Sequence, residues 1–290
     1  MCVWGCTYDN PRTPGEFQTS YLFYDARGAG RPAGRGQDGG VTPLLIHVPH
    51  ASDHISERER ADFSVSEGEL GAARRLLTDW FTDELYADGA DPEDVVAAPA
   101  SRLVVDVERF EDDAREPCAK SGMGAVYVST PWGAPLRRVS DERREQLLAA
   151  HYRPHHQRLD EAARIRLARF GRCVVLDAHS FPTLALPTQS DFSPPPEIGI
   201  GAEPGHTPPA LLAHAVGFFE ARGFKVGVNT PFSGAMVPSA FLGRDARVTS
   251  VMVEVRRDLY MDEAACARNS GFGRIREVLT EFRSTLSAVR

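Results

Sequence analysis

The segment Pro43-Leu44-Leu45-Ile46-His47-Val48-Pro49-His50 has the composition of a buried β-strand that ends at a histidine. A second segment, Cys173-Val174-Val175-Leu176-Asp177-Ala178-His179-Ser180, ends in the same way. Both are short, apolar and rich in β-branched residues, which is typical of strands in a parallel or mixed sheet. Ligands of open α/β sheets bind beyond the carboxyl ends of the strands, so His50 and His179 are expected at a binding site.

From residue 41 onward, predicted strands and helices alternate, which favours an α/β fold with a mixed, mostly parallel sheet covered by helices. The expected strands are residues 43–48, 95–98, 103–107, 173–178, 197–200, 224–228 and 249–255. The expected helices are residues 67–87, 140–169, 208–222 and 262–285. We expect residues 41–290 to form a single domain. Residues 1–40, rich in Gly and Pro after residue 27, are expected to be a flexible or loosely packed arm. The proline-rich segment 186–197 predicts a loop where an active-site lid would lie.

The composition is that of an ordinary globular protein, with 42% apolar and 25% charged residues in a chain of 290. A net charge of −7 without a basic stripe argues against nucleic acid or an anionic membrane as the partner. The first residues lack the positive-then-apolar order of a secretory signal. Five cysteines without regular spacing indicate a reduced, cytoplasmic protein. A homo-oligomer is compatible with this sequence.

A carboxylate, Glu254, lies inside the apolar segment Thr249-Ser250-Val251-Met252-Val253-Glu254-Val255. An unpaired charge in such a strand is costly, so Glu254 needs a partner. Together with two histidines at strand ends, it suits a divalent metal and a general base, and the sequence favours a metallohydrolase. The alternative is an ion pair between Glu254 and Arg256 or Arg257.

Arg109 ends the predicted strand 103–107, where its planar guanidinium could bind a substrate carboxylate or an oxyanion. The alternative is a surface salt bridge to Asp106, Glu108 or Asp112, which would contribute little. Arg102 lies at the opposite end of the same strand, which makes it the weaker candidate. His47 is expected in the core or behind a metal ligand.

Several segments in one order resemble the N-formylglutamate amidohydrolase family, over residues 43–285. They are Val48–Ser52, Thr78–Leu85, Ser101–Arg109, Tyr152–His156, Asp177–Ser180, Asn229–Gly234 and Glu254–Glu263. The resemblance implies a three-layer α/β fold like that of zinc carboxypeptidases and aspartoacylases, which hydrolyse an amide beside a carboxylate-bearing amino acid.

The resemblance also implies one zinc ion, with His50 and His179 as ligands. The third ligand is acidic, and we expect Asp79 in preference to Asp53 or Asp83. Glu254 would be the general base that takes a proton from metal-activated water. Arg109, Ser180 and Asn229 are expected to contact the substrate, and Asp177 to hydrogen-bond a ligand imidazole.

Two departures from the family pattern concern the substrate. The family reads Asp-x-Asn-Arg where this chain has Asp106-Val107-Glu108-Arg109, and it carries Arg and Lys at Pro231 and Ser233. The expected substrate is therefore a small N-formyl or N-acyl amino acid, similar to N-formylglutamate but not necessarily a dicarboxylate. The alternatives are a zinc peptidase or cell-wall amidase, and a non-catalytic binding module on the same fold.

Overall fold

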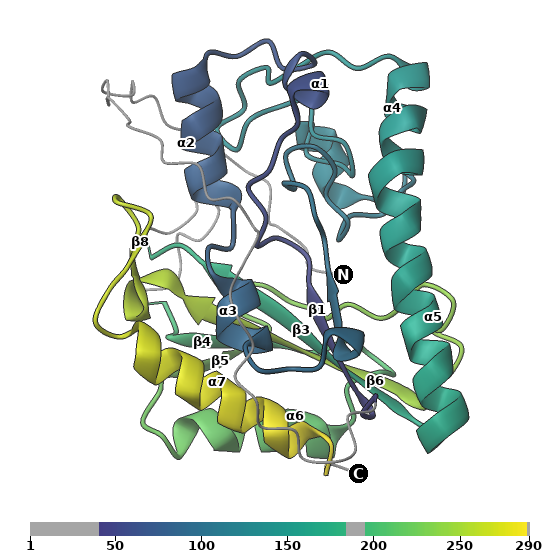
Figure 1. The fold of residues 1–290 in the computed structure, drawn as a ribbon, viewed down its shortest axis with the longest axis vertical. Helices are drawn as coiled ribbons and strands as arrows, with labels where there is room; N and C mark the ends of the chain where they lie inside the picture. Colours follow the sequence, from purple (N-terminus) through teal and green to yellow (C-terminus); the bar gives the residue numbers. More distant parts are fainter. Residues whose placement is uncertain (1–40, 184–194, 289–290) are drawn as a thin grey trace, which may run out of the picture.

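The computed structural model describes residues 41–183 and 195–288, which are built around a six-stranded sheet in the order β2-β1-β3-β6-β4-β5 (Figure 1). The strands are β1 (Leu44–Val48), β2 (Val95–Ala97), β3 (Cys173–Phe181), β4 (Ile198–Gly201), β5 (Val226–Val228) and β6 (Val248–Arg256). β2, β1, β3 and β6 are parallel, whereas β4 runs antiparallel to β6 and parallel to β5. The prediction of a mixed, mostly parallel sheet is confirmed. The predicted arm 1–40 and residues 186–194 of the predicted loop lie outside the described residues.

Helices cover both faces of the sheet, because alternate strand residues are apolar on both sides (Figure 1). One face, with Ile46, Leu176 and Val253, packs against α3 (Thr82–Ala87), α6 (Pro209–Glu220) and α7 (Phe272–Leu286). The other face, with Leu45 and Val175, packs against α5 (Arg153–Phe170). Within the described ranges, every helix is too short or too polar to cross a membrane.

The predicted helix 67–87 is wrong as a single element, since the chain forms α2 (Glu67–Leu77) and then α3. Thr78 leaves the helical conformation with ψ 132°, and Phe81 adopts a left-handed φ of 65°. Between them, the N–H of Asp79 donates to the carbonyl oxygen of His50 at 2.9 Å. This break brings Asp79 to the carboxyl end of β1.

The predicted strand 103–107 is wrong, because these residues form turns and irregular backbone. Two of their carbonyl oxygens are bound by a buried side chain instead of a neighbouring strand. The guanidinium of Arg137 donates to the carbonyl oxygens of Leu103 and Val104 at 2.9 and 2.8 Å. The alternating apolar pattern of 103–107 reflects the burial of residues in turns. Periodicity alone does not distinguish such buried turns from a strand.

The predicted helix 140–169 is confirmed as α4 (Asp141–Leu147), a π-helical turn over Leu148–Tyr152, and α5. Ser140 caps it, accepting a hydrogen bond from the N–H of Arg143 at 3.1 Å. The predicted helix 262–285 begins ten residues late, at Phe272, since its first part forms a hairpin. The remaining elements are α1 (Glu57–Arg60), the hairpin strands β7 (Met261–Asp262) and β8 (Ala267–Arg268), and 3₁₀ turns over Pro92–Asp94, Pro117–Ser121 and Arg257–Leu259.

Candidate active site

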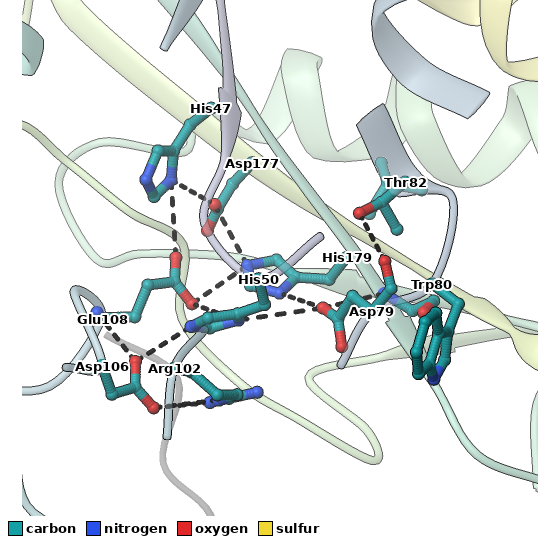
Figure 2. Close-up of polar contacts among 12 residues, drawn as sticks. His47, His50, Asp79, Trp80, Thr82, Arg102, Asp106, Glu108, Asp177 and His179 are labelled. Atoms are coloured by element: carbon teal, nitrogen blue, oxygen red, sulfur yellow. Dashed lines mark hydrogen bonds and ion pairs between the residues drawn. The ribbon is translucent and has the colours of Figure 1, made fainter. Parts of the chain in front are cut away.

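Three potential metal ligands converge where β1, β3 and the break between α2 and α3 meet (Figure 2). The Nδ1 atom of His179 lies 3.0 Å from Oδ2 of Asp79, and Nδ1 of His50 lies 3.8 Å from the same oxygen. The three side chains are only 1–3% exposed. Two imidazole nitrogens and one carboxylate oxygen form a donor set that suits zinc.

Each of the two histidines is held by a carboxylate on its other ring nitrogen (Figure 2). The Nε2 atom of His50 lies 2.9 Å from Oδ1 of Asp106, and Nε2 of His179 lies 3.2 Å from Oδ1 of Asp177. Such carboxylates fix the tautomer and orientation of ligand imidazoles. The buried Nδ1 of His50 has no hydrogen-bond partner among the described residues. The arrangement therefore fits a cation at that nitrogen.

The other two acidic candidates lie away from the histidines. Asp53 forms an ion pair with Arg74, and its side chain is 42% exposed. Asp83 is exposed on α3. Of the three, Asp79 alone joins the cluster with His50 and His179, because the helix break turns it toward the sheet.

Asp79 is also anchored on its second oxygen. The guanidinium of Arg257 lies 3.1 Å from Oδ1, and the same group donates to the carbonyl oxygen of Leu76 at 2.7 Å. Burial alone would raise the pKa of Asp79, but the hydrogen bond to His179 and the nearby imidazole of His50 lower it well below its ordinary value. Asp79 is therefore a carboxylate at neutral pH, as a metal ligand must be.

Glu254 lies on β6 directly opposite His179 of β3 in the sheet register, and its side chain faces the same cavity. Its Oε2 atom is buried and has no hydrogen-bond partner among the described residues. Burial raises the pKa of Glu254 to about 8. The two arginines considered as its partners contact other groups: Arg256 pairs with Asp258 and Arg257 with Asp79.

A small cavity opens above the cluster, and its lining decides which side chains can reach a bound molecule. It is lined by His50, Asp79, Arg102, Glu108, His179, Ser180, Phe181, Pro182, Phe232, Glu254 and Arg257. Ser180 lies at the cavity, with its Oγ accepting a hydrogen bond from Nε of Arg257 at 3.2 Å.

Two residues expected at the site lie elsewhere. Arg109 is fully buried and does not line the cavity, with its Nε 3.8 Å from Asp106 and 4.0 Å from Glu116. Asn229 is exposed in a left-handed turn, where its Oδ1 accepts a hydrogen bond from the N–H of Ala202 at 2.8 Å. Because residues 103–107 form turns rather than a strand, Arg102 faces the cavity and Arg109 does not. The arginines at the cavity are Arg102 and Arg257.

Sequence reasoning missed the roles of Asp106 and Glu108, which it considered only as ion-pair partners of Arg109. Their only local signal was the closeness of two carboxylates in Asp106-Val107-Glu108. In the structure, Asp106 holds His50, and Glu108 lines the cavity with its Oε2 3.0 Å from Nε2 of His179. Arg257 was missed because its contact with Asp79 depends on the helix break.

The family model for N-formylglutamate amidohydrolases matches residues 42–261. The chain belongs to this family. N-formylglutamate deformylases from Pseudomonas putida and Pseudomonas aeruginosa are 31% and 32% identical to this amidohydrolase, over 77% and 78% of its chain and 84% and 85% of theirs. The amidohydrolase is therefore a hydrolase that acts on amide C–N bonds.

Solved structures agree with the fold of this amidohydrolase. An N-formylglutamate amidohydrolase from Ralstonia eutropha superposes with a TM-score of 0.74, covering 87% of this chain and 95% of that one at 23% identity. A gene product of Agrobacterium tumefaciens superposes with a TM-score of 0.54 at 22% identity, covering 84% and 92%. At these identities the likeness concerns the fold alone.

Proposed function

We propose that this enzyme hydrolyses the amide of a small N-formyl or N-acyl amino acid, with a zinc ion held by His50, Asp79 and His179. The observation that supports this proposal is the buried Nδ1 of His50, which has no hydrogen-bond partner among the described residues and faces Asp79. When bound, such an ion lowers the pKa of water and polarises an acyl oxygen. A fold related to that of zinc carboxypeptidases and aspartoacylases is also part of this proposal.

Glu254 is the general base in this proposal. Its buried Oε2 faces the cavity without a hydrogen-bond partner among the described residues, so it is available to a water molecule. It takes a proton from the attacking water and delivers it to the nitrogen of the departing amine. The positive charge of a bound divalent ion favours the carboxylate form of Glu254, which opposes the rise in its pKa caused by burial.

The substrate carboxylate binds Arg102 and Arg257 in this proposal, in place of the expected Arg109. Both guanidiniums line the cavity, and both are buried, where a charge-assisted hydrogen bond is strong. The relatives are named for N-formylglutamate. Glu108 and Glu254 add negative charge to the same cavity, so the proposal extends to neutral N-formyl amino acids of similar size.

The first prediction concerns the metal. We expect His50→Ala to bind about one zinc ion fewer per chain than the wild type, because it removes a ligand nitrogen. Asp79→Ala should behave in the same way, whereas Asp53→Ala should not, since Asp53 is bound to Arg74 away from the cluster. Elemental analysis of protein prepared without chelator measures this. Equal zinc content in His50→Ala and wild type would contradict the ligand assignment.

The second prediction concerns the substrate. Wild type should release formate from N-formylglutamate or N-formylglutamine, and the reaction should stop on chelation and resume with added zinc. Replacing the α-carboxylate by a carboxamide should lower kcat/KM about 10–100-fold, because a charge-assisted hydrogen bond contributes roughly 1.5–3 kcal/mol. Cleavage of the carboxamide at the same rate would show that the arginines do not bind a carboxylate. A formate assay with both compounds provides the measurement.

A further inference from the structure

A second group of potential metal ligands lies next to the first, on the far side of the His179 ring (Figure 2). It consists of His47 from β1, Asp177 from β3 and Glu108 from the turns after residue 102. The Nδ1 atom of His47 lies 2.8 Å from Oδ1 of Asp177 and 3.5 Å from Oε1 of Glu108. Separations of this size are those of neighbouring ligands around a metal whose bonds are about 2.0–2.2 Å long.

Without a cation, the burial of this second group of side chains would cost free energy. His47, Glu108 and Asp177 are at most 2% exposed. The carboxylates of the first site have arginine partners, with Asp79 beside Arg257 and Asp106 beside Arg102.

The ion pairs of Asp177 and Glu108, in contrast, are with imidazoles. A single protonated imidazole does not balance two buried negative charges, so a cation at this place would offset a large desolvation cost.

Glu108 supplies the observation that points to a ligand. Neither of its oxygens has a hydrogen-bond partner among the described residues, although Oε2 lies 3.0 Å from Nε2 of His179 and Oε1 faces His47. Most buried carboxylate oxygens are hydrogen-bonded, so two such atoms on one side chain require an explanation.

The other two side chains are already oriented for coordination. The Oδ2 atom of Asp177 accepts a hydrogen bond from the N–H of Met236 at 2.7 Å, which leaves Oδ1 directed at the cluster. The Nε2 atom of His47 contacts Nε2 of His155 at 2.9 Å, which leaves Nδ1 facing Asp177 and Glu108. A cation there displaces the proton that otherwise lies between His47 and Asp177.

We propose that His47, Glu108 and Asp177 form a second divalent-metal site beside the first. One imidazole and two carboxylates suit Zn²⁺ or Mn²⁺. The proposal goes beyond the reaction proposed above and does not depend on it.

Metal stoichiometry tests the second site. After removal of metal with a chelator and dialysis against Zn²⁺, wild type should contain about two zinc ions per chain and Glu108→Gln about one. Glu111→Gln is the matched control, because Glu111 pairs with Arg153 outside the cluster, and it should keep both. His50→Ala should retain the ion of the second site. The loss of zinc from the first site can therefore be told apart from its loss from the second. Circular dichroism checks that each variant is folded.

His47→Asn provides a second route, since asparagine still donates a hydrogen bond to Asp177 but is a poor metal ligand; it should also bind about one zinc ion. Anomalous scattering from wild-type crystals soaked in zinc requires no variant and should show a peak within bonding distance of Glu108 and Asp177. Equal zinc content in wild type and Glu108→Gln, or no such peak, would overturn the proposal.

Discussion

Glu254→Gln is expected to fold, to retain its metal and to lose at least ~100-fold in the rate of formate release, the usual contribution of a positioned general base. Glutamine matches the volume of glutamate, so packing opposite His179 is preserved. The amide does not accept a proton from water at neutral pH, however. Steady-state kinetics with N-formylglutamate and N-formylglutamine measure the loss.

The ion-pair alternative for Glu254 predicts the opposite pattern. If Glu254 only stabilised the strand, Glu254→Gln would lower the melting temperature and leave turnover per folded molecule almost unchanged. Glu277→Gln, an exposed substitution on α7, serves as the control and should change neither quantity. Retention of most of the wild-type rate by Glu254→Gln would rule out its role as the base.

Asp106→Ala should lower the free energy of unfolding by about 3–5 kcal/mol, the usual cost of removing one partner from a buried ion pair. Asp106 is fully buried and accepts hydrogen bonds from Arg102 at 2.7 and 3.1 Å and from the hydroxyl of Tyr127. Its removal leaves the buried guanidinium of Arg102 without this counter-charge. Urea denaturation of the metal-free protein measures the change.

The control for this substitution is Asp112→Ala in the same segment. Asp112 is exposed and accepts a hydrogen bond from the N–H of Ala114, so its loss should cost no more than about 1 kcal/mol. If Asp106→Ala does not fold, Asp106→Asn keeps the shape of the side chain and should show an intermediate loss of stability. Equal stability of the Asp106 and Asp112 variants would mean that the charge of Asp106 does not contribute to the stability of the fold.

The strands that carry His50, His179 and Glu254 could be predicted because their signals are local. An apolar β-branched run of five to nine residues is buried on both faces wherever it pairs, so β1, β3 and β6 were found within three residues of their ends. Parallel strands of one sheet bring their carboxyl ends to one edge. That rule was enough to place two histidines and a glutamate together.

The segments between these strands could not be predicted, because long-range partners decide their conformation. The break at Thr78–Phe81 depends on a hydrogen bond from Asp79 to His50, 29 positions earlier in the chain. The turns at 103–107 depend on the guanidinium of Arg137. The hydrophobic periodicity of each segment gives no sign of its distant partner.

The sequence by itself determined which strands form the sheet and which of their polar residues lie at its carboxyl edge, since burial and periodicity are properties of short segments. Tertiary structure alone decided that Asp79 rather than Asp53 or Asp83 joins the histidines, that Arg102 and Arg257 rather than Arg109 reach the cavity, and that Glu108 and Asp177 meet His47. Each of these outcomes depends on side chains many residues apart. Their contacts arise only when turns and helix breaks are fixed by packing and by buried hydrogen bonds.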